Sequence, residues 1–101
     1  MKNGYKILWT DFALFELKQT IVYLEENWTE KELKNLAKEI EATLMLLSHN
    51  PYLFQASELK KDIRRVVVAR HNTLYYRIQN STIEILSFFS NRQNPQKRKL
   101  K

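Results

Sequence analysis

The sequence predicts an α+β protein in which an N-terminal strand and a helical hairpin precede a three-stranded antiparallel sheet, with the helices packed on one face. Apolar residues alternate near the N-terminus and recur at three- and four-residue spacing over residues 11–50. Residues 63–89 are then dense in β-branched and aromatic side chains. The element order is therefore β-α-α-β-β-β. A chain of 101 residues fits one domain, which we predict over residues 1–92, with a basic, flexible tail over 93–101.

The first strand and the first helix follow each other without a break. Tyr5, Ile7 and Trp9 alternate with other residues as in a strand, and Asp11 offers an N-cap side chain for a helix over residues 11–27. One helical stripe is apolar and is expected to face the core: Leu14, Leu17, Ile21, Leu24 and Trp28.

A second helix is predicted directly after the first. Thr29 and Glu32 form a capping box at its start, and Asn50 followed by Pro51 ends it, because proline disfavours the helical region for its predecessor. The join between the helices is only one or two residues long, so the helices must run antiparallel.

Three strands are predicted over residues 63–70, 73–79 and 82–89. Asn80 and Ser81 join the last two as a hairpin, and Arg70, His71 and Asn72 form a similarly short turn. Because the chain contains one glycine, asparagine is expected to carry the turns.

The positive charge is concentrated in the second half of the chain. The formal net charge is +6, and residues 56–101 carry eleven Lys and Arg against three Asp and Glu. Such asymmetry attracts polyanions or acidic protein surfaces. The alternative is a solvating role, since Lys97, Arg98, Lys99 and Lys101 supply half of the excess.

Several classes of protein do not fit this composition. There is no cysteine, and His49 and His71 are too far apart and too poorly accompanied for a zinc cluster, so we expect no metal or other cofactor. No apolar stretch reaches the length of a signal peptide or a membrane span. We therefore expect a cytoplasmic protein that has neither a membrane partner nor a small-molecule substrate.

A cationic edge is the first candidate site. Arg64 and Arg65 are adjacent on one strand and must point to opposite faces, although the period alone does not say which faces the helices. The next strand should expose Tyr75 and Arg77. Arg92 is expected to approach this group, together with the two lysines that precede the strand, Lys60 and Lys61. Such a cluster can grip phosphates or pair with carboxylates, unless it is only a solvated edge.

Two further features have open interpretations. His71 is either a general acid or base or a solvent-exposed turn residue, with no Asp or Glu nearby in sequence to orient it. Phe12, Phe15 and Tyr23 lie away from the apolar stripe, where they pack against the flank of the sheet or form a patch that a partner covers.

Four short segments together resemble the ParE branch of the RelE/ParE toxins. They are Leu47-Ser48-His49-Asn50-Pro51-Tyr52, Ile63-Arg64-Arg65-Val66-Val67, Leu74-Tyr75-Tyr76-Arg77 and Arg92-Gln93-Asn94-Pro95. The resemblance implies a toxin of a type II toxin–antitoxin pair, whose antitoxin wraps around it and covers its working surface. ParE members poison DNA gyrase, whereas RelE members cut mRNA in the ribosome.

The resemblance favours the gyrase poison over the nuclease. The RNA-cutting relatives use an arginine before the Leu-x-Tyr string and a terminal acid or base, and here those places hold Thr73 and Arg98. Phosphodiester cleavage needs proton transfer as well as charge. If the chain were a nuclease, Arg64, Arg92, His71 and Tyr75 would be its candidate catalytic residues.

We thus expect an inhibitor of gyrase, without an assigned enzymatic activity, that is held silent by a cognate antitoxin. The expected target contacts are Lys60, Lys61, Arg64, Arg65, Arg77 and Arg92, and the expected antitoxin contacts are Phe12, Phe15 and Tyr23. The alternatives are a ribosome-dependent mRNA endonuclease and a degenerate toxin that survives as a repressor module with its antitoxin.

Overall fold

A computed structural model describes residues 4–27, 30–56 and 62–90 of the chain and confirms the predicted element order. The elements are β1 (Lys6–Trp9), α1 (Asp11–Asn27), α2 (Glu30–His49), β2 (Ile63–Val68), β3 (Asn72–Gln79) and β4 (Thr82–Ser90). The predicted domain boundary at residue 92 and the predicted tail over 93–101 lie outside the described residues.

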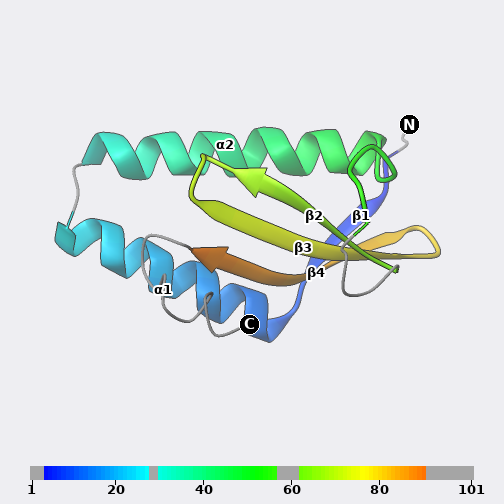
Figure 1. Cartoon of the computed structure of the whole chain (residues 1–101), viewed down its shortest axis with the longest axis horizontal. Helices are drawn as coiled ribbons and strands as arrows, with labels where there is room; N and C mark the ends of the chain where they lie inside the picture. Colours follow the sequence, from blue (N-terminus) through cyan, green and yellow to red (C-terminus); the bar gives the residue numbers. More distant parts are fainter. Residues whose placement is uncertain (1–3, 28–29, 57–61, 91–101) are drawn as a thin grey trace.

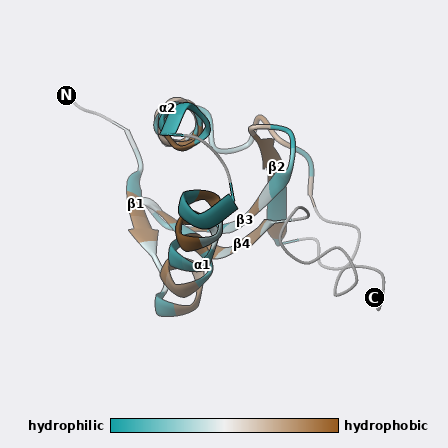
Figure 2. Cartoon of the chain, turned by 90° about the vertical axis from the view of Figure 1, so that its left-hand side faces the viewer, coloured by the Kyte–Doolittle hydropathy of each residue, from teal (hydrophilic) through white to brown (hydrophobic). Residues whose placement is uncertain are grey.

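The four strands form one mixed sheet in the order β1-β4-β3-β2 (Figure 1). β2, β3 and β4 are antiparallel neighbours, and β1 joins the β4 edge in parallel. A β-bulge interrupts the β3–β4 ladder, since Tyr75 pairs with Ser87 while Tyr76 pairs with Ile85. Figure 2 shows β1 and β2 at the two edges, with α1 lying in front of β3 and β4.

The junction of β1 and α1 is fixed by Thr10, and not by the predicted Asp11. The Thr10 hydroxyl accepts a hydrogen bond from the N–H of Ala13 at 3.2 Å, as an N-cap residue does, and donates one to the carbonyl of Ile85 at 2.8 Å. Asp11 is instead the first helical residue, where its charge favours the positive end of the helix dipole. One side chain thus caps α1 and ties it to β4.

The buried face of α1 differs from the predicted stripe. Ala13, Thr20 and Leu24 are buried, Leu17 and Ile21 are only partly buried, and Leu14 is 47% exposed. Residues 13, 20 and 24 share one side of the helix. Because Ala13 and Thr20 are small, α1 can approach the sheet closely, and an apolar count from the sequence overlooks them. Trp28 lies outside the described residues.

The core lies between the helices and one face of the sheet. Its fully buried members come from all elements except β1: Ala13, Leu24, Leu36, Leu47, Val66, Val68, Leu74, Tyr76, Ile83, Ile85 and Phe88. On β3 the predicted alternation holds for Leu74 and Tyr76, which are completely buried, while Tyr75 and Arg77 point to the opposite face.

The two hairpin turns differ in the residue types that adopt a positive φ. Asn80 has a φ of 55°, which confirms that this asparagine carries its turn. In the β2–β3 turn the positive φ falls on Ala69 (50°) and Arg70 (71°), whereas Asn72 is already part of β3. The prediction that asparagine carries both turns is therefore wrong for the β2–β3 turn.

Candidate functional site

The two adjacent arginines of β2 point to opposite faces of the sheet, and the register decides which goes where. Arg64 pairs with the buried Tyr76, so it lies on the helix side, and Arg65 pairs with Tyr75 on the face that the helices leave open. The predicted arginines therefore do not form one surface.

Arg64 is engaged within the fold. Its guanidinium donates a hydrogen bond to the carbonyl of Phe54 at 2.5 Å and lies 5.1 Å from the ring centroid of Tyr52. The neighbouring Tyr76 hydroxyl donates to the carbonyl of Pro51 at 2.8 Å. These two side chains anchor the loop that follows α2, since each satisfies one of its carbonyl groups.

The burial of Tyr76 also changes its acidity. Loss of solvent around the phenol raises the pKa of Tyr76 from 10.0 to about 12, while the positive charge of Arg64 acts in the lowering direction. The hydroxyl therefore remains a hydrogen-bond donor throughout the neutral range.

Arg65 and Arg77 share the open face of the sheet. Their backbone positions are diagonal neighbours, because Arg65 pairs with Tyr75 and Arg77 pairs with Ile63. Arg77 donates a hydrogen bond to Glu84 at 2.7 Å within a salt bridge. This hydrogen bond, and then the charge of the carboxylate, raise the pKa of the Arg77 guanidinium above its usual value. The open face thus presents an aromatic ring between two permanently charged guanidinium groups.

The remaining predicted basic contacts, Lys60, Lys61 and Arg92, lie outside the described residues. Of the candidate nuclease residues, the structure describes three and separates them. Arg64 is on the helix side, Tyr75 is on the open face, and His71 lies in the β2–β3 turn. The structure therefore does not bring Arg64 together with His71 or Tyr75, as the nuclease interpretation requires.

The three candidate antitoxin contacts occupy two places. Phe12 and Phe15 are 60% and 58% exposed on α1, as a patch open to a partner requires. Tyr23 is half-buried and lines a pocket at the other end of the helix. The sequence pattern grouped these residues because all three leave the apolar stripe.

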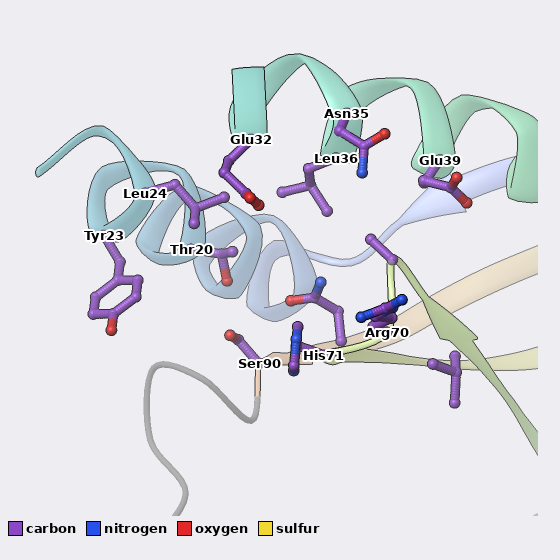
Figure 3. Close-up of a pocket in the computed structure, with 13 residues that line it drawn as sticks. Thr20, Tyr23, Leu24, Glu32, Asn35, Leu36, Glu39, Arg70, His71 and Ser90 are labelled. Carbon is purple, nitrogen blue, oxygen red and sulfur yellow. The ribbon is translucent and has the colours of Figure 1, made fainter. Parts of the chain in front are cut away.

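The pocket that contains Tyr23 has a volume of about 560 Å³ and lies between α1, α2 and the β2–β3 turn (Figure 3). Its lining residues come from α1 (Thr20, Tyr23, Leu24), α2 (Glu32, Asn35, Leu36, Glu39), the β2–β3 hairpin (Val67, Ala69, Arg70, His71, Asn72) and Ser90 at the end of β4. This site joins residues up to 70 positions apart in the chain.

The two walls of this pocket carry opposite charges. Glu32 and Glu39 project from α2, with Asn35 between them, while Arg70 and His71 stand on the turn below (Figure 3). The sequence pattern indicated Tyr23 and His71 as candidate site residues, but not Arg70 or the two glutamates. The seven-residue spacing of the glutamates, two helical turns on one side of α2, was the available signal.

The turn that carries Arg70 is strained and held in place. Each non-glycine residue in the left-handed region costs about 1 kcal/mol. The amide N–H of His71 donates to the carbonyl of Ala69 at 2.7 Å, and the buried Asn72 side chain donates to the carbonyl of Val68 at 3.1 Å. These bonds fix the direction in which the turn presents its side chains.

Within the described part of the chain, no group of three or more metal-ligating side chains could hold a metal ion. Neither described helix combines the length and the apolar character of a membrane span.

A helical hairpin on a four-stranded sheet, with an exposed apolar patch on α1 and two arginines on the open face, defines a small α+β protein. The comparisons with known proteins give its family. A family model described as "ParE toxin of type II toxin-antitoxin system, parDE" matches residues 7–95. The chain belongs to this family of ParE toxins.

A solved structure supports the same fold. A chain described as "Chromosomal ParDE TA system from P. aeruginosa" matches with a TM-score of 0.71 and 16% sequence identity, over 86% of this chain and 96% of that chain. No curated protein sequence matches.

Proposed function

We propose that this chain inhibits DNA gyrase in the cytoplasm and is neutralised by a cognate antitoxin. The observation that carries the proposal is the family match over residues 7–95, which covers the β-α-α-β-β-β unit except for Lys6. The similarity to a ParDE TA system supports an antitoxin as the partner.

Two separate surfaces support two separate contacts. We assign the target to the open face of the sheet, where Arg65 and Arg77 flank Tyr75, because partly exposed guanidinium groups beside an aromatic ring suit macromolecular recognition. We assign the antitoxin to Phe12 and Phe15 on α1 and to the pocket near Tyr23. Arg64 has a structural role in this scheme.

The test uses the purified chain, gyrase, ATP and relaxed plasmid. We expect loss of supercoiling, or accumulation of cleaved DNA, as the chain is titrated. Preincubation with the protein encoded by the neighbouring reading frame should restore gyrase activity. A topoisomerase I reaction serves as the control for nonspecific DNA binding by a chain of net charge +6.

Unchanged supercoiling at a large excess of the chain would contradict the gyrase target. Toeprints on translated mRNA then distinguish the alternative, since codon-specific cuts would indicate a ribosome-dependent endonuclease. No observation on the described residues favours that second function.

A further inference from the structure

In the pocket between α2 and the β2–β3 turn, Glu39 and Arg70 carry opposite charges on opposite walls. Among the described residues, the salt bridge is that of Arg77 and Glu84, so Glu39 forms no ion pair with Arg70 across the pocket. Glu39 and Arg70 are exposed and face each other from the two walls (Figure 3). Both charges remain available to a ligand that enters between them.

The basic wall is preorganised. Arg70 is presented by a turn with two successive positive φ values, and hydrogen bonds within residues 68–72 hold that turn. Backbone strain that the surrounding structure maintains is concentrated at functional sites in proteins. Binding of a ligand to Arg70 and His71 therefore costs little conformational entropy in this turn.

The charge pattern selects the chemistry of the ligand. A phosphate or another simple anion would be attracted by Arg70 but repelled by Glu39, and a simple cation would be attracted by Glu39 but repelled by Arg70. Both walls are satisfied only by a ligand that carries an acidic group and a basic group side by side. A peptide with adjacent residues of opposite charge has this chemistry, and a volume of about 560 Å³ accommodates two such side chains.

We propose that Glu39 on one wall, with Arg70 and His71 on the other, forms a two-charge clamp for a segment of the antitoxin. In the clamp, a carboxylate of the antitoxin binds Arg70 and His71, and a neighbouring basic side chain binds Glu39. The buried side chains of Leu24 and Leu36 form the apolar part of the same pocket. This inference rests on the proposed antitoxin partner and adds the chemistry that recognises it.

The test measures the Kd of the full chain for the protein encoded by the neighbouring reading frame. Glu39→Arg and Arg70→Glu should each weaken binding about 10- to 100-fold, because each places like charges against the bound segment. The double variant Glu39→Arg/Arg70→Glu keeps the net charge of +6 but reverses the clamp, so its binding should stay weak. If net charge alone steered the antitoxin, the double variant would recover the parent Kd, and the clamp would be wrong.

Matched controls and milder variants keep this result interpretable. Lys34→Glu/Glu41→Arg makes the same pair of charge reversals at exposed positions of α2 outside the pocket and should leave the Kd within twofold of the parent value. If the reversed variants lose their cooperative thermal transition, Glu39→Gln and Arg70→Gln remove each charge with little change of size, and each should weaken binding about 3- to 10-fold.

In a complementary series, the antitoxin is changed at one adjacent pair of charged residues at a time, so that the acidic and the basic residue change places. One of these exchanges should restore binding to the double variant. Absence of binding by the parent chain would refute the antitoxin partner itself. Tight binding by every pocket variant would refute only the clamp. If the variants change the Kd only while residues 93–101 are present, the pocket recognises the chain's own basic tail, and the clamp is refuted as well.

Discussion

Single residues in this protein owe their roles to the partners that the fold gives them. Arg64 and Arg65 are chemically identical, yet one anchors a loop through the carbonyl of Phe54 and the other faces solvent on the open side of the sheet. Similarly, Arg70 occupies a backbone conformation that favours glycine. A mutation can separate the free-energy cost of that backbone conformation from the contribution of the Arg70 side chain to binding in the pocket.

Arg70→Gly should stabilise the fold and weaken antitoxin binding. Glycine adopts a φ of 71° without steric cost, so we expect the free energy of unfolding to rise by up to about 1 kcal/mol, after allowance for the greater chain entropy of the unfolded state. Chemical denaturation measures the first effect and a binding titration measures the second. A fall in both stability and affinity would indicate that the Arg70 side chain supports the fold.

Tyr76 should make stability fall at alkaline pH. Its pKa in the folded state, about 12, lies above the value of 10.0 for an exposed tyrosine, so the folded state holds the proton more tightly than the unfolded state. This contribution is complete below pH 10 and is lost between pH 10 and 12, by about 2 to 3 kcal/mol in total.

Tyr76→Phe removes this pH dependence. At pH 8 the variant should be less stable by about 1 to 2 kcal/mol, because the carbonyl of Pro51 loses its hydrogen bond. The difference should shrink as unfolding is measured up to pH 11.5. Tyr75→Phe on the opposite face is the control, and parallel stability curves for Tyr76→Phe and the parent would contradict the effect of burial.

At the scale of the elements, α1 is joined to β4 by polar contacts at both ends of its first two turns. Thr10 bonds to the carbonyl of Ile85, and the carboxylate of Glu16 accepts hydrogen bonds from the Ser87 hydroxyl at 2.6 Å and the Phe88 N–H at 2.8 Å. β1 pairs with β4 only as far as Ile85, and beyond that point Glu16 supplies an acceptor for the N–H of Phe88.

Glu16→Ala should therefore destabilise the fold by about 2 to 3 kcal/mol, since the N–H of Phe88 loses a charged acceptor. Ser87→Ala should cost less, because the carboxylate keeps the backbone donor. In a double-mutant cycle the two changes should couple by at least about 0.5 kcal/mol. Additive effects on the free energy of unfolding would show that the Ser87 contact contributes nothing.

At the scale of the whole molecule, the proposed target face and the proposed antitoxin contacts lie on different sides of the fold. Arg65 and Tyr75 belong to the face that the helices leave open, whereas Phe12 and Phe15 belong to α1 on the covered side. An antitoxin bound at α1 and the pocket would then act on the target face by its own bulk or by extending around the sheet edge.

Arg65→Glu should consequently reduce inhibition of gyrase at least tenfold while changing the Kd for the antitoxin less than threefold. Phe12→Ser/Phe15→Ser should do the opposite, because it removes only the apolar patch of α1. A supercoiling assay and a binding titration on the same preparations provide both values. If both variants impair both activities equally, the two contacts share one surface.

The sequence by itself determined the order and type of the elements. Periodicity is a local signal, and it predicted α1 over residues 11–27 as the structure has it. The Asn50-Pro51 stop is equally local, and it predicted the end of α2, which the structure places at His49. The same local patterns placed Leu74 and Tyr76 in the core, because alternation along one strand is set by the pleat alone.

Only the tertiary structure decided which charged side chains share a surface. Whether Arg64 or Arg65 faces the helices depends on the pairing of β2 with β3, and the pocket joins Glu39 to Arg70, which are 31 positions apart in the chain. The burial of Ala13 and Thr20 in place of Leu14 depends on how closely α1 approaches β4. These facts are set by the packing of distant segments, which residue spacing along one element does not encode.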